Sequence, residues 1–150
     1  MTTPLTRPGY VVDTSVAVKW YVEREEENVR HAQQLLENWG YGRCTLSAPE
    51  LLIFELANAL SCRRGVKLAQ VLESLNHLRS LGLHLEALRW DTLAKALEIA
   101  SSCGAAVYDS YFLAMALESN GILVTADQVF LRKVRRYPSV VSLSQLRLPD

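Results

Sequence analysis

Short apolar runs alternate with helical segments along the whole chain, and no other feature of the sequence limits the fold as strongly. The expected strands are residues 10–13, 44–48, 83–88, 122–125 and 140–142. Strands that each lead into a helix form right-handed crossovers and pair in parallel. The sequence therefore predicts a three-layer α/β/α domain, with a central parallel sheet of about five strands flanked by about seven helices.

Helical periodicity and end signals mark the segments between these strands. Thr14 or Ser15 should cap the first helix, the acidic run at residues 23–27 should open the second, and Asp91 or Thr92 should cap the fifth. The expected helices are residues 16–22, 23–39, 51–64, 68–81, 93–103, 110–119 and 128–136. The repeated helix after each strand covers both faces of the predicted sheet.

Composition agrees with a single folded domain over residues 1–150. Hydrophobic residues make up 49% and charged residues 21%, which excludes a disordered or collagen-like chain. Lys+Arg 16 balances Asp+Glu 16, so binding to a polyanion would need a local basic cluster. The 3 cysteines are widely spaced, and the sequence shows neither a signal peptide nor a membrane span. We therefore expect a cytoplasmic protein without membrane contact.

Aspartates lie where ligands bind in sheets of this kind. Asp13 ends the first strand, Asp127 follows the fourth, and Asp109 precedes the helix expected at residues 110–119. Ligands bind outside the carboxyl ends of parallel strands where the strand order reverses, and we expect the first and fourth strands to be neighbours there. Three converging carboxylates would repel one another unless a divalent cation neutralised them.

Glu55 adds a fourth acid from an otherwise apolar helix at residues 51–64. Asn58 follows it by three residues and shares its face, whereas Glu50 points about 140° away. An oxygen-only set without neighbouring His or Cys ligands suits Mg²⁺ or Mn²⁺ better than zinc. Carboxylate clusters of this kind align a water for phosphodiester cleavage, so the chemistry indicated is metal-assisted hydrolysis.

Four short motifs follow one another along nearly the whole chain. They are VVDTS at residues 11–15, ELANAL at 55–60, YDSYFLAMA at 108–116 and TAD at 125–127. In this order and spacing the set resembles the PIN-domain ribonucleases and, within them, the VapC-type toxins of prokaryotic toxin–antitoxin pairs.

The resemblance implies a site, a cofactor and partners. The four acids would form the Mg²⁺ or Mn²⁺ site of an endoribonuclease: Asp13, Glu55, Asp109 and Asp127. Ser15 and Thr125 would be hydroxyl groups that support these ligands, and we place Asn58 with them because it shares the face of Glu55. The resemblance also implies an RNA substrate, a homodimer and a cognate antitoxin protein that blocks the cleft.

Two basic clusters could grip RNA phosphates. One follows Glu55 and the other lies close behind Asp127; the members are Arg63, Arg64, Lys67, Arg132, Lys133, Arg135 and Arg136. A solvated helix face explains the same charges equally well.

Other interpretations stay open at this point. Aspartates at strand ends and helix starts often serve only as turn or cap residues. A receiver-like phosphoacceptor module also uses Mg²⁺, but no lysine follows Val140. A phosphatase of the haloacid dehalogenase type needs a second aspartate where Ser15 stands. A binding-only PIN scaffold is the remaining alternative, and the intact set of acids argues against it.

Overall fold

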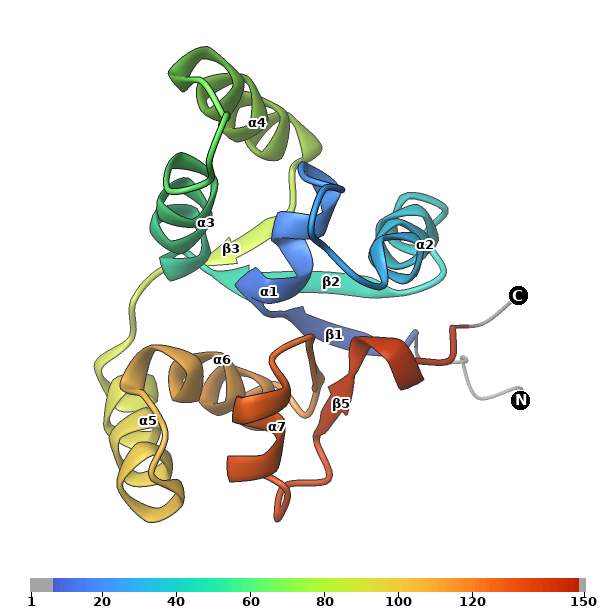
Figure 1. Ribbon diagram of the computed structural model, residues 1–150. Coiled ribbons are helices and arrows are strands. Elements are labelled where there is room, and N and C mark those ends of the chain that lie inside the picture. The colour runs from blue at the N-terminus through green and yellow to red at the C-terminus, as the bar shows by residue number, and fades with distance from the viewer. Residues whose placement is uncertain (1–6, 149–150) are drawn as a thin grey trace, which may run out of the picture.

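A five-stranded parallel sheet forms the centre of the computed structural model, which describes residues 7–148 (Figure 1). The strands are β1 (Gly9–Val12), β2 (Thr45–Pro49), β3 (His84–Glu86), β4 (Ile122–Thr125) and β5 (Val140–Ser142). Their order is β3-β2-β1-β4-β5, and each neighbouring pair is parallel. The predicted α/β class is confirmed, and β1 and β4 are neighbours as expected.

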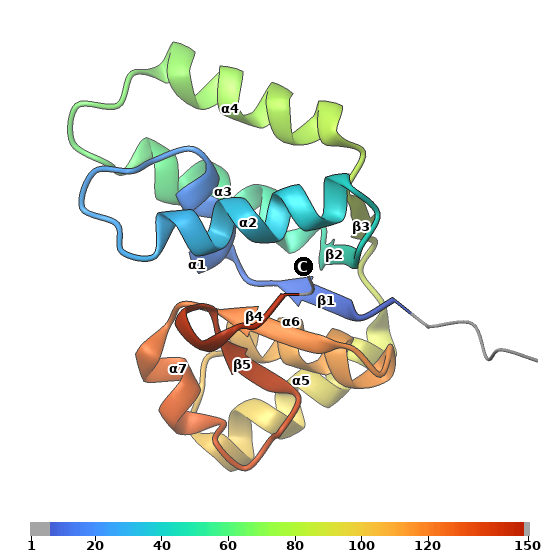
Figure 2. The same ribbon diagram turned by 90° about the vertical axis from the view of Figure 1, so that its right-hand side faces the viewer.

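Helices lie on both sides of the sheet (Figure 2). They are α1 (Thr14–Ala17), α2 (Val29–Gly40), α3 (Leu51–Ser61), α4 (Leu68–Leu81), α5 (Trp90–Cys103), α6 (Val107–Glu118) and α7 (Gln128–Lys133), with 3-10 turns η1 (Val18–Trp20) and η2 (Leu143–Gln145). Figure 2 shows α1 to α4 on one side of β1 and α5 to α7 on the other. Within residues 7–148, no helix is long and apolar enough to cross a membrane.

The core forms around the central strands. Val11, Val12, Leu123 and Val124 are buried in β1 and β4, as side chains of a parallel sheet covered on both faces should be. Every residue from 110 to 116 in α6 is also buried, so this helix is enclosed by the sheet and α5. Burial of α6 holds its first turn firmly beside the carboxyl ends of the strands.

The acidic run at residues 23–27 does not open a helix, and this prediction was wrong. It lies in a loop before α2, where Glu25 and Asn28 have positive φ values of 61° and 57°. Glu26 turns inward and pairs with the buried Lys19 and with Arg63. A tertiary ion pair therefore outweighs the favourable placement of anions at a helix N-terminus.

Several helix starts also differ from the prediction. Asp13, and neither Thr14 nor Ser15, caps α1 by accepting a hydrogen bond from a backbone N–H. Neither Asp91 nor Thr92 caps α5, which begins at Trp90 with Arg89 as its N-cap residue. The hydroxyl of Thr92 donates instead to Glu118 of the neighbouring α6.

The ends of three other helices shift as well. The start of α6 at Val107 places Asp109 inside its first turn and not before it. α3 ends at Ser61 and α7 at Lys133, three residues earlier than expected in each case. Parts of both basic clusters consequently lie in the turns that follow these helices.

Candidate functional site

Asp13 occupies the centre of the carboxyl edge of the sheet, between the ends of β1 and β4. It is only 6% exposed, and its Oδ2 accepts hydrogen bonds from Ser15 N at 3.3 Å, Ser15 Oγ at 2.5 Å and Thr125 Oγ1 at 3.0 Å. Among residues 7–148 no donor binds Oδ1, which is not fully buried. One oxygen of this carboxylate is therefore held by the protein, and the other is available to a ligand.

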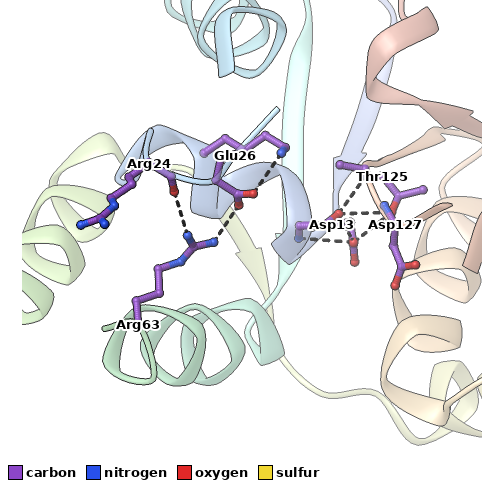
Figure 3. A network of polar contacts seen from close by, with 9 residues as sticks. Asp13, Arg24, Glu26, Arg63, Thr125 and Asp127 are labelled. Carbon is purple, nitrogen blue, oxygen red and sulfur yellow. Dashed lines mark hydrogen bonds and ion pairs between the residues drawn. The ribbon is translucent and has the colours of Figure 1, made fainter. Parts of the chain in front are cut away.

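Ser15 and Thr125 connect the two strand ends through their hydroxyl groups. Ser15 Oγ accepts the backbone N–H of Ala126 at 2.9 Å, and Thr125 Oγ1 accepts that of Asp127 at 3.1 Å. The two hydroxyls lie 3.3 Å apart, and Figure 3 shows Asp13, Thr125 and Asp127 close together. Both hydroxyls that the sequence singled out thus contact Asp13 directly.

Asp127 takes its position from the start of α7. Its Oδ1 accepts the N–H of Phe130 at 3.0 Å, which makes it the N-cap of this helix. The carboxylate is partly buried and lies next to Asp13 (Figure 3). The helix cap therefore fixes a second acid at this edge.

Glu55 reaches the same edge from α3. Its Oε1 accepts a hydrogen bond from Thr14 Oγ1 at 2.8 Å, across 41 residues of sequence. Burial raises the pKa of Glu55 to about 7; the hydrogen bond from Thr14 opposes this rise, and the charges of Asp13 and Asp109 add to it. Thr14 was not among the predicted site residues, although it directly follows Asp13 in the VVDTS motif and begins α1.

Asp109 completes the group from the first turn of α6. Burial raises its pKa to about 6, and the charges of Asp13 and Asp127 raise it further, while that of Lys133 lowers it. The pKa of Asp13 is raised as well, first by burial and also by the charge of Asp127, against the effect of its hydrogen bonds. The carboxylates thus lie near enough to repel one another.

The chemistry of the four carboxylates suits a hard divalent cation, but their side chains do not yet surround a metal position. Within residues 7–148, no three His, Cys, Asp or Glu side chains lie close enough together to hold a metal ion as they stand. All four candidate ligands are carboxylates, which Mg²⁺ and Mn²⁺ prefer. Burial is the main cause of the raised pKa values of Asp13, Glu55 and Asp109, and repulsion between the carboxylates adds to it. A cation at this edge would relieve that repulsion.

Within residues 7–148, none of the remaining predicted site residues forms a hydrogen bond or an ion pair with the four acids. Asn58 is exposed and accepts the thiol of Cys62 at 3.6 Å; it makes no hydrogen bond to Glu55. Arg63 pairs with Glu26 at 2.9 Å, and Arg136 donates to a backbone oxygen of residue 102 at 3.0 Å. The other predicted cations are exposed: Arg64, Lys67, Arg132, Lys133 and Arg135.

Comparison with known proteins gives one family and a set of similar structures. The model of the PIN domain family matches residues 10–136. No curated protein matches the chain. A toxin–antitoxin complex from Klebsiella pneumoniae is similar with a TM-score of 0.67 and 16% identity, covering 91% of this chain and 99% of that one.

Two further solved structures have a similar fold. PAE2754 from Pyrobaculum aerophilum has a TM-score of 0.63 and 23% identity, covering 91% of this chain and 90% of its own. VapC20 from Mycobacterium tuberculosis, a sarcin-ricin loop cleaving toxin, has a TM-score of 0.65 and 15% identity, covering 82% of this chain and 93% of its own. At these identities the likeness establishes the fold.

Proposed function

This chain belongs to the PIN domain family, and we propose that it is a metal-dependent endoribonuclease acting as the toxin of a toxin–antitoxin pair. The observation that supports this most is the approach of four carboxylates at one edge of the sheet: Asp13, Glu55, Asp109 and Asp127. The likeness to toxin structures supports the biological role. We further propose that the chain forms one domain over residues 1–150.

The four carboxylates would hold Mg²⁺ or Mn²⁺ at this edge. When bound, the ion would supply Lewis acidity for hydrolysis of a phosphodiester bond. Ser15 and Thr125 hold Oδ2 of Asp13 and so orient Oδ1 toward the ligand position. Thr14 holds Oε1 of Glu55, which leaves Oε2 available to accept a proton from a water molecule.

An antitoxin and a second copy of the chain are the proposed protein partners, and the cytoplasm is the proposed location. The toxin–antitoxin complex from Klebsiella pneumoniae supports the antitoxin. Exposed apolar side chains support the second copy: Phe54, Leu88 and Tyr108 line a cavity of about 310 Å³ beside Leu93 and Tyr111. Apolar patches of this kind commonly mark protein interfaces.

The homodimer can be tested at this patch. Replacing Phe54 with Glu places a charge on the apolar surface, so we expect a dimer in the wild-type protein and a monomer in the variant by light scattering. Tyr41→Glu is the matched control, because Tyr41 is also exposed but lies before β2, away from the patch. A monomeric wild-type protein would contradict the proposal.

The nuclease activity is tested by incubating the purified protein with RNA in the presence of Mg²⁺ or of EDTA. We expect cleavage with Mg²⁺, none with EDTA, and none by Asp13→Asn, which removes a ligand charge with little change in volume. Asp91→Asn makes the same chemical change at an exposed position of α5 and should keep full activity. Full Mg²⁺-dependent cleavage by Asp13→Asn would show that the site is assigned wrongly.

A further inference from the structure

A basic pocket lies at the C-terminal end of α3, away from the acidic edge. Arg24, Arg63 and Arg64 line a cavity of about 510 Å³, and Glu25 is the acid in its lining. The sequence groups Arg63 and Arg64 with Lys67, but the third cation that lines the pocket is Arg24 and not Lys67. The loop before α2 brings it there from far along the chain.

The three arginines differ in their partners. Arg63 donates to Glu26 at 2.9 Å and to the backbone oxygen of Arg24 at 3.2 Å, so it anchors the loop (Figure 3). Arg24 and Arg64 are exposed, and neither forms an ion pair with an acid within residues 7–148. Figure 3 shows the side chain of Arg24 pointing away from Glu26. Two guanidinium groups of the pocket are therefore free to bind an anion.

One face of α3 joins this pocket to the acidic edge. Ala59 and Cys62 line the pocket and follow Glu55 by four and seven residues, which places all three on the same side of the helix. Asn58 lies on that side too and accepts the thiol of Cys62. Seven residues of helix span about 10 Å, a distance that a few nucleotides of single-stranded RNA can cover.

We propose that Arg24 and Arg64 bind a backbone phosphate of the RNA substrate, a few nucleotides from the bond that is cleaved, with the strand lying along α3 over Asn58. The inference rests on the proposed nuclease function. An edge built from four carboxylates repels RNA, so the substrate needs positive contacts elsewhere on its path. Guanidinium groups suit this task because their planar fork matches two phosphate oxygens at once.

Binding of RNA across a salt series tests the subsite. The probe is a short fluorescein-labelled oligouridylate, and all proteins carry Asp13→Asn so that binding is separated from cleavage. Arg24→Gln with Arg64→Gln should weaken binding and reduce the dependence of log Kd on log salt by about 0.7 for each phosphate that the protein no longer neutralises. The matched control is Arg43→Gln with Arg79→Gln, which removes the same charge near the starts of β2 and β3, at the opposite edge. Its slope should equal that of the background protein.

Cleavage by the otherwise unaltered enzyme gives an independent test. For the Arg24→Gln, Arg64→Gln variant, kcat/KM should fall on a long oligouridylate and stay unchanged on a dinucleotide, which cannot reach the pocket. An equal fall on both substrates, or an unchanged salt slope, would overturn the subsite while the nuclease proposal stands. Weaker capture of the antitoxin with unchanged RNA binding would also overturn it, because the pocket would then serve an acidic protein. A wild-type protein that cleaves no RNA would instead defeat the proposed function.

Discussion

The two oxygens of Asp13 have different tasks at the scale of single residues. Oδ2 accepts hydrogen bonds from Ser15 and Thr125, whereas Oδ1 has no donor within residues 7–148. Thr125 also accepts the N–H of Asp127, so one buried hydroxyl orients two of the four acids. The positions of these carboxylates therefore depend on a residue that carries no charge.

Replacing Thr125 with Val tests that dependence. The variant keeps the shape of the side chain but removes a donor to a carboxylate and an acceptor for a backbone N–H. We expect the free energy of unfolding to fall by about 2 kcal/mol, measured by urea denaturation. Thr125→Ser, which keeps the hydroxyl, should be destabilised less and retain cleavage. Equal destabilisation of the two variants would contradict the hydroxyl role.

Glu55 makes the stability of the metal-free protein depend on pH. Its pKa is raised from 4.5 to about 7, so the folded state binds this proton more tightly than the unfolded state does. The resulting stability is fully present below pH 4.5 and is lost as the pH rises through about 7. Asp109, raised from 3.8 to about 6, acts in the same direction over its own range.

Glu55→Gln should therefore flatten this pH dependence, because the amide does not titrate. We expect the variant to unfold at higher urea concentration than the wild-type protein at pH 8 in EDTA, and to lose that advantage toward pH 4.5. Glu98→Gln removes an exposed carboxylate of α5 and should leave the profile unchanged. A wild-type protein that gains stability between pH 4.5 and 7 in EDTA would contradict the assignment.

At the scale of elements, α7 carries an acid at one end and cations at the other. Asp127 caps its start, and Arg132 and Lys133 occupy its last turn. Lys133 lies close enough to Asp109 to lower the pKa of that acid. One cation of the predicted basic helix, Lys133, therefore stabilises the charged form of an acid at the edge.

Lys133→Gln should raise the pKa of Asp109 further, because it removes the cation that opposes the neighbouring carboxylates. The measurement is an NMR titration of the side-chain carboxyl carbon in metal-free protein. Arg132→Gln removes the same charge from the adjacent position and should shift this pKa less. Equal shifts in the two variants would mean that only the net charge of the helix matters.

At the scale of the whole molecule, the acidic edge joins elements from both sides of the sheet. Glu55 comes from α3 and Asp109 from α6, with Asp13 and Asp127 between them at the ends of β1 and β4. A cation held by all four would link the two helical layers. Its binding should then stabilise the fold as a unit.

Addition of Mg²⁺ should accordingly raise the Tm of the wild-type protein in differential scanning calorimetry. Binding to the folded state alone contributes about 2.7 kcal/mol when the ion is present at a hundred times its Kd. The gain should vanish in Asp13→Asn and persist in Asp91→Asn, the exposed control. An equal gain in all three proteins would place the ion elsewhere.

The topology also separates the proposed function from its alternatives. A receiver-like module would carry its phosphorylated aspartate after a strand in the middle of the chain, whereas here Asp13 follows the first strand, β1, and Asp127 follows the fourth, β4. The family match over residues 10–136 agrees with the PIN interpretation. The cleavage experiment tests the remaining alternative, a binding-only scaffold, which would bind RNA without cleaving it.

Local sequence patterns were enough to predict the α/β class, the strands and the nearness of Asp13 and Asp127. Apolar periodicity acts over a few residues, and parallel strands place their carboxyl ends at one edge whatever the details of packing. The helix at residues 68–81 was predicted to the residue because its leucine stripe and Gly82 act within a few turns.

Packing in three dimensions settled which side chains meet across long stretches of chain. The hydrogen bond from Thr14 to Glu55, the inward turn of Glu26 toward Lys19 and Arg63, and the approach of Arg24 to the end of α3 all join separate elements. Such contacts depend on how helices pack over the sheet, which sequence spacing does not specify. The sequence shows that a residue is an arginine but does not show whether its guanidinium group pairs with a distant acid or stays free for a ligand. The packing of the elements decides between the two.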